Sequence, residues 1–209
     1  MQSKKTVLIL AGGKSKRFLH FDKCFITLNN KPLIQHTIDK VSGVADEIIV
    51  AARDEKQGEE IEDKIPQKIA LVFDSLKDIG PLAGLLSGLE RASFSLSLVI
   101  GCDMPFVSPD VAKFLFEIAS SGCDAVVPKW ENGLVEPLHA VYRKEPMLAA
   151  IKEATGKGAK KIFDVLLQLK NVYFVSVKEI REIDPYLRTF ININTPDALK
   201  KIQTNPNSV

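Results

Sequence analysis

Apolar and polar residues follow one another along the first half of the chain in a pattern of short strands and amphipathic helices. Four segments are apolar at almost every position, which is typical of strands covered on both faces of a sheet. These segments are residues 6–10, 47–51, 69–73 and 96–100. Helices are predicted between them at residues 32–41, 55–64 and 81–92. This order predicts an α/β fold in which a mostly parallel sheet carries helices on both faces.

The last third of the chain has a weaker pattern. Residues 135–142 alternate between apolar and polar side chains, which predicts a strand with His139 half-buried on it. Residues 190–194 predict a final strand. Because strand side chains alternate between faces, Asn192 and Asn194 would share one face of that strand.

Composition limits the class of protein. The chain has 209 residues without an internal repeat or a flexible linker, which predicts one domain over residues 1–209. Its 28 basic and 26 acidic residues leave a formal charge of +2, too small and too evenly spread for a nucleic-acid-binding face. No apolar run approaches the roughly 20 residues of a membrane span, and the N-terminus does not resemble a signal peptide. We therefore expect a cytoplasmic protein with neither a nucleic acid nor a membrane as partner.

The clearest functional motif lies at the end of the first apolar segment. That segment stops at Gly12 and Gly13, which let the backbone approach a ligand closely and expose N–H groups to an anion. Leu8 stands where a Walker loop needs a glycine, and no third glycine completes a dinucleotide fingerprint. The sequence therefore predicts another kind of triphosphate loop, or else a plain turn with solvated basic residues. The basic residues that follow are Lys14, Lys16, Arg17 and Lys23.

Two aspartates follow other predicted strands. Ligands bind at the carboxyl ends of parallel strands, so Asp74 and Asp103 are expected to meet the Gly12 loop in one crevice. Asp103 stands before Met-Pro, where a carboxylate is well placed to hold Mg²⁺ together with phosphate oxygens. Asp74 has the weaker case, because Asp-Ser after a strand also makes an Asx turn.

A glycine-rich helix start follows Asp74. Gly80 precedes a proline, which is typical of the beginning of a helix, and Gly84 would let a ligand or another element approach closely. Tight helix packing explains Gly84 and Gly88 equally well. The basic segment at residues 152–161 is interrupted by glycines, which fits either a mobile lid over an anionic acceptor or an exposed loop.

Together these motifs resemble those of the molybdenum cofactor guanylyltransferases, and the resemblance runs nearly end to end. The matching segments are Leu10-Ala11-Gly12-Gly13-x-Ser15-x-Arg17, Asp22-Lys23, Lys31-Pro32-Leu33-Ile34, Asp74-Ser75, Gly80-Pro81-Leu82-Ala83-Gly84, Cys102-Asp103-Met104-Pro105 and Asn192-x-Asn194-Thr195-Pro196. The first motif is shared by many nucleotidyltransferases, whereas its combination with the others is much more specific.

The resemblance implies a single-domain Rossmann-like nucleotidyltransferase fold with a mixed, mostly parallel sheet. It also implies a reaction in which GMP passes from GTP to molybdopterin, pyrophosphate is released and Mg²⁺ is the cofactor. The nucleotide would be bound within about residues 1–108 and the acceptor within about residues 109–209. Transient contact with other proteins of molybdenum cofactor synthesis is a further expectation.

Specific residues take roles by the same resemblance. Those expected at the nucleotide are Leu10, Ala11, Gly12, Gly13, Lys23, Asp74 and Asp103. Those expected to serve catalysis are Arg17, Lys23 and Asp103, with Asp103 also the metal ligand. Those expected at the acceptor are Gly80, Gly84, Asn192 and Asn194.

The chain departs from the family pattern in two places. Leu19 and His20 stand where glycines are common, and Ala52 stands where the family can have an asparagine that touches the nucleotide. The motifs therefore predict nucleotide transfer and leave the choice of base open. The alternatives are a related transferase that uses CTP or another acceptor such as cobinamide phosphate, and a GTP-binding module without catalysis.

Overall fold

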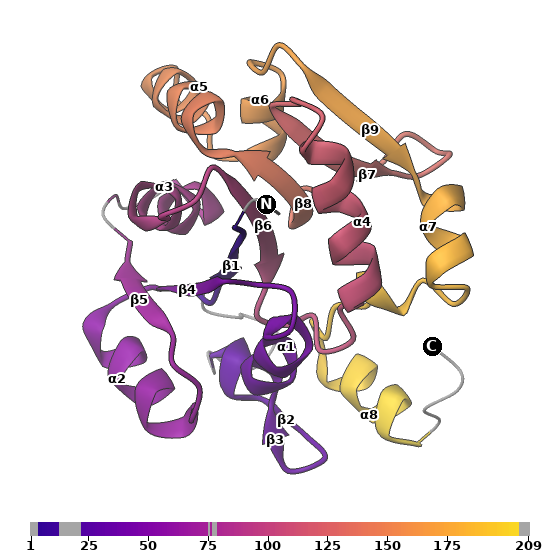
Figure 1. The fold of residues 1–209 in the computed structure, drawn as a ribbon. Helices are drawn as coiled ribbons and strands as arrows, with labels where there is room; N and C mark the ends of the chain where they lie inside the picture. The colour runs from indigo at the N-terminus through magenta and orange to yellow at the C-terminus, as the bar shows by residue number, and fades with distance from the viewer. Residues whose placement is uncertain (1–3, 13–21, 75, 77–78, 205–209) are drawn as a thin grey trace.

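The computed structural model describes residues 4–12, 22–74, 76 and 79–204. Within these residues, seven strands form one sheet in the order β5-β4-β1-β6-β8-β7-β9 (Figure 1). Every neighbouring pair is parallel except the two that involve β8, which runs antiparallel to β6 and to β7. The strands are β1 (Thr6–Leu10), β4 (Glu47–Ala52), β5 (Ala70–Phe73), β6 (Leu96–Gly101), β7 (Ala125–Lys129), β8 (His139–Arg143) and β9 (Val172–Ser176). The predicted α/β class and its mixed, mostly parallel sheet are confirmed.

Helices connect these strands, and a short hairpin stands apart from the main sheet. The α-helices are α1 (Leu33–Val41), α2 (Glu55–Lys64), α3 (Pro81–Arg91), α4 (Pro109–Ala119), α5 (Lys144–Gly156), α6 (Ile162–Leu166), α7 (Val177–Ile183) and α8 (Pro196–Thr204). The remaining elements are the 3-10 helices η2 (Lys23–Phe25) and η3 (Arg188–Phe190) and the hairpin strands β2 (Thr27–Leu28) and β3 (Lys31–Pro32). The three helices predicted in the first half are confirmed to within one residue at each end.

The sheet separates two hydrophobic cores, because side chains alternate along each strand. On β1, Val7 and Ile9 are buried with α1, α2, α4 and α7 on one face. Leu8 and Leu10 are buried with α3, α5 and α6 on the other face. The continuous apolar run in the sequence is therefore explained by a strand that is covered on both sides.

Helix α3 lies close against β1 because Gly88 has no side chain. A Cβ added at Gly88 would lie 2.3 Å from Leu8 Cδ1, and Leu8 is fully buried. At the other end of the helix, Gly80 has φ +59 and Pro81 is the first helical residue. With α3 packed closely on β1, the N-terminus of the helix lies at the carboxyl edge of the sheet.

The expected strand at residues 190–194 is wrong. Phe190 ends η3, and the next four residues are irregular. The Ile193 N–H donates to the Asp103 carbonyl at 2.9 Å, so the segment crosses the loop after β6 instead of joining a strand. Among the described residues, no helix combines the length and the apolar character that crossing a membrane requires.

Candidate functional site

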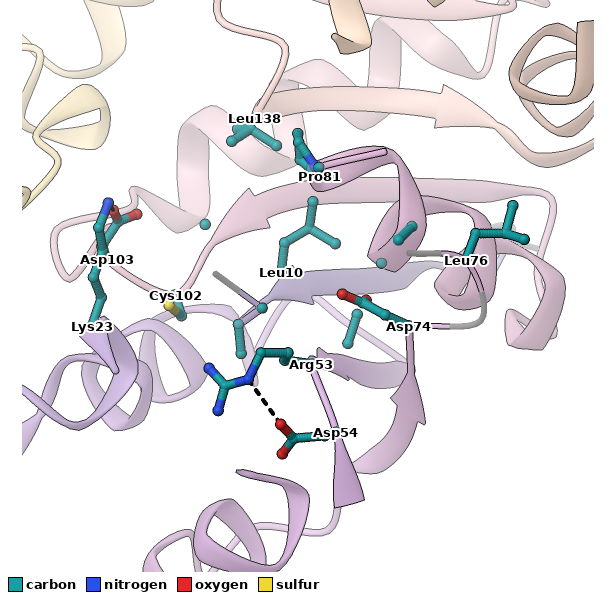
Figure 2. Close-up of a pocket in the computed structure, with 17 residues that line it drawn as sticks. Leu10, Lys23, Arg53, Asp54, Asp74, Leu76, Pro81, Cys102, Asp103 and Leu138 are labelled. Atoms are coloured by element: carbon teal, nitrogen blue, oxygen red, sulfur yellow. Dashed lines mark hydrogen bonds and ion pairs between the residues drawn. The ribbon is translucent and has the colours of Figure 1, made fainter. Parts of the chain in front are cut away.

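A cavity of about 800 Å³ opens at the carboxyl edge of the sheet (Figure 2). Its walls come from the ends of β1, β4, β5 and β6 and from the first turns of α3. Most of the residues predicted for the site line it, although they are far apart in the sequence. These are Leu10, Ala11, Gly12, Lys23, Asp74, Gly80, Gly84 and Asp103. Predicted residues Gly13 and Arg17 lie outside the described residues.

The turn after β1 is held against the neighbouring strand. The N–H groups of Ala11 and Gly12 both donate to the Ala51 carbonyl, at 2.9 and 3.2 Å. A Cβ added at Gly12 would lie 3.2 Å from Asp74 Oδ2. A side chain at this position would crowd the Asp74 carboxylate, which would have to move by a few tenths of an ångström.

Asp74 lies between two glycines of the site. A Cβ added at Gly84 would lie 3.3 Å from Asp74 Oδ1 and 3.1 Å from Ala51 Cβ. Among the described residues, Asp74 Oδ1 is buried and has no hydrogen-bond partner. Burial raises the pKa of this carboxyl to about 6, and the charge of Arg53 only partly opposes that rise. A buried acceptor without a partner is unfavourable, so a ligand N–H that reached the Asp74 carboxylate would stabilise the site.

Gly84 therefore serves both of the roles that the sequence left open. It lines the cavity, and it also permits the close packing of α3 on β1 and β4, since its added Cβ would lie 3.3 Å from Leu10 Cδ2. Gly88 serves packing alone, because its neighbours are the side-chain atoms of Leu8.

Lys23, Asp103 and Asn194 meet at one point beside the cavity. The Lys23 Nζ donates to Asp103 Oδ2 at 3.2 Å and also donates to Asn194 Oδ1. The Asp103 side chain is only 14% exposed. A Cβ added at Gly101 would lie 2.6 Å from Asp103 Oδ1, so this glycine lets the carboxylate turn back over the end of β6. The ammonium group of Lys23 is thus surrounded by side-chain oxygen atoms of Asp103 and Asn194.

The two predicted asparagines do not behave alike. Neither asparagine is among the cavity-lining residues. Asn194 contacts the cavity-lining Lys23, whereas the Asn192 side chain donates to the Phe190 carbonyl at 3.2 Å. Their expected common strand face does not exist, because the segment is irregular. Of the two asparagines, Asn194 is thus the one that contacts other predicted residues within the part of the chain that the structure describes.

Sequence analysis missed Arg53, which follows β4 at the same sheet edge. Its guanidinium lines the cavity and forms an ion pair with both carboxylate oxygens of Asp22, at 2.6 and 3.2 Å, and with Asp54 at 2.8 Å. The hydrogen bonds to Asp22 hold the pKa of Arg53 well above its usual range. The rule that ligands bind at strand carboxyl ends pointed to this position too.

His139 occupies the start of β8, where a strand was predicted. It is fully buried rather than half-buried, and burial lowers its pKa to about 3. Its Nε2 lies 3.1 Å from Thr189 Oγ1, and that hydroxyl accepts the N–H of Ser108 at 3.0 Å. The imidazole therefore anchors the segment before Asn194 and takes no part in the cavity.

Comparisons with known proteins agree with this geometry. A family model described as MobA-like NTP transferase domain matches residues 7–172. The chain is 40% identical over 205 residues to a probable molybdenum cofactor guanylyltransferase of Methanosarcina mazei, covering 96% of this chain and 91% of that relative.

Solved structures share the fold. Molybdopterin-guanine dinucleotide biosynthesis protein A of Archaeoglobus fulgidus superposes with a TM-score of 0.83 at 33% identity, covering 98% of this chain and 100% of that one. The 4-diphosphocytidyl-2C-methyl-D-erythritol synthase of Anaerococcus prevotii has a TM-score of 0.71 at 17% identity, covering 98% and 96%. The second likeness shows the fold alone.

Proposed function

The chain belongs to the MobA-like NTP transferase family, and from this membership we propose that it transfers GMP from GTP to molybdopterin and releases pyrophosphate. Relatives that match nearly the whole chain are named as molybdenum cofactor guanylyltransferases, which supports this reaction. The observation that carries it is the meeting of Lys23, Asp103 and Asn194 beside the cavity that the turn after β1 lines. These side chains have the charge and the oxygen atoms that a triphosphate and its counter-ion need.

The choice of guanine is supported by Asp74. Its carboxylate lies on the opposite side of the cavity from the Lys23–Asp103 pair, as Figure 2 shows, so base and phosphates would have separate ends. Guanine presents two adjacent donors, its ring N–H and its amino group, which two carboxylate oxygens can accept. Cytosine presents an amino group beside an acceptor nitrogen, which would face a carboxylate oxygen unfavourably.

The residues present also fit Mg²⁺. Among the described residues, no three His, Cys, Asp or Glu side chains gather into a metal site, so such an ion would need ligands from the substrate. Mg²⁺ is commonly held by one or two carboxylates together with phosphate oxygens. Asp103 would hold it, with the Asn194 amide oxygen nearby, since both already face a positive charge on Lys23. When bound, the ion would neutralise part of the triphosphate charge.

In the proposed reaction a terminal phosphate oxygen of the acceptor forms a bond to the α-phosphorus of GTP. The bond from that phosphorus to the pyrophosphate oxygen breaks, and pyrophosphate leaves with the electron pair. Lys23 is proposed to stabilise the charge that develops on the leaving group, and Arg17 is predicted to act with it. Reactions of this kind depend on positioning and electrostatic stabilisation rather than on a covalent intermediate.

The acceptor is proposed to bind to the half formed by residues 109–209. Asn194 and the cavity-lining Leu138 come from this half. The first half of the basic segment at residues 152–161 belongs to the end of α5. The rest of that segment lies beside the same site, because the Lys160 carbonyl oxygen is 3.4 Å from the position of a Cβ on Gly80. Closure of this segment over an anionic acceptor stays a prediction, as does contact with other proteins of cofactor synthesis.

The test is pyrophosphate release, measured with Mg²⁺ and each of GTP, CTP, ATP and UTP, with and without molybdopterin. Release with GTP only, and only when molybdopterin is present, supports the proposal. Release with CTP in place of GTP would retain the chemistry at Asp103 and overturn the choice of base. Binding of GTP without release, with the correct acceptor supplied, would indicate a module without catalysis.

A further inference from the structure

Helix α2 has a polar sequence that predicts a surface helix, yet one of its polar side chains is completely buried. Gln57 has no exposed surface, whereas most of the charged residues around it in the helix are exposed. A buried amide without hydrogen bonds destabilises a fold by about 1–3 kcal/mol. The burial of Gln57 therefore depends on the partners that its amide finds.

Those partners belong to three separate segments of the site. Gln57 Nε2 donates to the Ala11 carbonyl at 3.1 Å and to Cys24 Sγ at 3.6 Å. Its Oε1 accepts the backbone N–H of Arg53 at 2.8 Å. Ala11 and Arg53 line the cavity, and Cys24 follows Lys23 directly in η2.

Arg53 extends this connection toward Lys23. The Gln57 amide fixes the Arg53 backbone, and the Arg53 guanidinium binds both carboxylate oxygens of Asp22. Asp22 immediately precedes Lys23 in the chain. The segment that carries Lys23 is therefore held from both sides, through Asp22 and through Cys24, and both connections lead back to Gln57.

We propose that Gln57 is a positioning residue of the nucleotide site, which sets the turn after β1, the end of β4 and the Lys23 segment relative to one another. It touches no substrate itself. The proposal rests on the proposed function only in its use of GTP as the ligand. Its consequence is that loss of the Gln57 amide weakens nucleotide binding more than loss of a comparable buried amide elsewhere.

The chain offers such a comparable amide for a matched control. Gln35 on α1 is 6% exposed, and its Nε2 donates to Asp39 Oδ1 and to Gln67 Oε1, both at 2.7 Å. Neither partner is among the cavity-lining residues. Gln57→Met and Gln35→Met remove the same buried amide group and replace it with a side chain of similar size.

The experiment measures the Kd for GTP with Mg²⁺ by calorimetry, without acceptor, and the Tm of each variant. Gln57→Met is expected to weaken GTP binding about 10-fold or more. Gln35→Met is expected to change the Kd less than 2-fold. Its Tm is expected to fall less than that of Gln57→Met, because Gln35 Oε1 is buried without a partner among the described residues, whereas both polar atoms of the Gln57 amide are hydrogen-bonded. Gln57→Asn keeps a buried amide on a side chain too short to reach all three partners, and the same loss of affinity is expected for it.

Three results would overturn the proposal. Gln57 variants that bind GTP within 2-fold of the wild-type chain would remove the positioning role, and Gln57→Asn decides the question if Gln57→Met does not fold. An equal loss of affinity in Gln35→Met would assign the effect to general stability. If the wild-type chain binds no nucleoside triphosphate, both proposals are overturned. If it binds CTP in place of GTP, only the proposed function is overturned, and the variants are then compared in their Kd for CTP.

Discussion

The ammonium nitrogen of Lys23 lies 3.2 Å from a carboxylate oxygen of Asp103, although 80 residues separate them in the chain. The same nitrogen also donates to Asn194 Oδ1. Two oxygen ligands from different loops are thus arranged around a single positive charge. A triphosphate that enters the cavity would offer Lys23 further oxygen partners, and Asp103 would then be available to the counter-ion.

Asp103→Ala is expected to lower turnover at least 100-fold, about 2.7 kcal/mol of transition-state stabilisation. The reason is that Asp103 is the carboxylate that faces Lys23 and would hold Mg²⁺. Initial rates of pyrophosphate release at saturating GTP and acceptor measure the loss. Asp110→Ala removes a 71% exposed carboxylate on α4 and should leave the rate within 2-fold. A folded Asp103→Ala chain with near-normal turnover would contradict the assignment.

Asn194→Ala and Asn192→Ala are expected to differ. The Asn194 oxygen contacts Lys23, whereas the Asn192 side chain donates to the carbonyl of Phe190. Loss of Asn194 should therefore lower kcat about 10-fold or more, while loss of Asn192 should have a smaller effect on kcat. Steady-state kinetics with the acceptor as the varied substrate separate kcat from KM, and equal kcat values for the two variants would refute this difference.

Asp74→Asn is expected to stabilise the protein without ligand at pH 8. Burial raises the pKa of Asp74 to about 6, above its ordinary value, so the ionised carboxylate destabilises the folded chain. The folded chain is therefore more stable below pH 4, where Asp74 is protonated in both the folded and the unfolded state. This stability is lost as the pH rises through 6. At pH 8 the gain in unfolding free energy should be on the order of 2 kcal/mol, and it should shrink at pH 5. Urea unfolding at both pH values measures it.

The same Asp74→Asn variant is expected to bind GTP more weakly. An asparagine keeps one acceptor oxygen but turns the other position into a donor, which faces the donors of guanine. The preference for GTP over CTP should therefore fall about 10-fold or more in competition binding. A more stable variant with an unchanged preference would show that Asp74 does not read the base.

Gly84→Ala and Gly88→Ala on α3 are expected to differ in their effect on nucleotide affinity, although both crowd the packing of the helix on the sheet. The new methyl group of Gly84→Ala would crowd the cavity near Asp74, so nucleotide affinity should fall. The methyl group of Gly88→Ala would lie 2.3 Å from a fully buried Leu8 and should cost about 1–3 kcal/mol of stability with affinity preserved. Paired urea unfolding and calorimetry test this, and a reversed pattern would be inconsistent with the packing described.

His139→Gln is expected to reduce the loss of stability in acid. Burial lowers the pKa of His139 to about 3 in the folded chain, whereas an unfolded histidine titrates near 6.5. As the pH falls below 6.5, the unfolded chain gains a proton that the folded chain excludes, and stability is lost. At pH 4.5 the loss of unfolding free energy due to His139 is about 2–3 kcal/mol relative to pH 7.5. The difference between wild type and variant in urea unfolding at these pH values should show it; parallel losses would argue against a buried neutral imidazole.

The sequence predicted most of the cavity because its signals are local. Gly12, Asp74 and Asp103 each follow an apolar segment, and a parallel sheet brings such positions to one edge. Arg53 satisfied the same rule and was overlooked. Gln57 had no local signal, since a glutamine in a polar helix has the pattern of a surface residue, and its burial depends on what packs against the helix.

The distribution of apolar and polar residues by itself determined the order of strands and helices in the first half. The continuous apolar run of β1 also determined its burial on both faces, because both features depend on neighbouring residues in the chain. The tertiary structure decided what the local pattern does not contain. Residues 190–194 have the composition of a strand, but the contact of Ile193 with the Asp103 carbonyl draws them across the end of β6. The division of roles between Asn192 and Asn194, and the connections through Gln57, likewise arise only from contacts between segments distant in the chain.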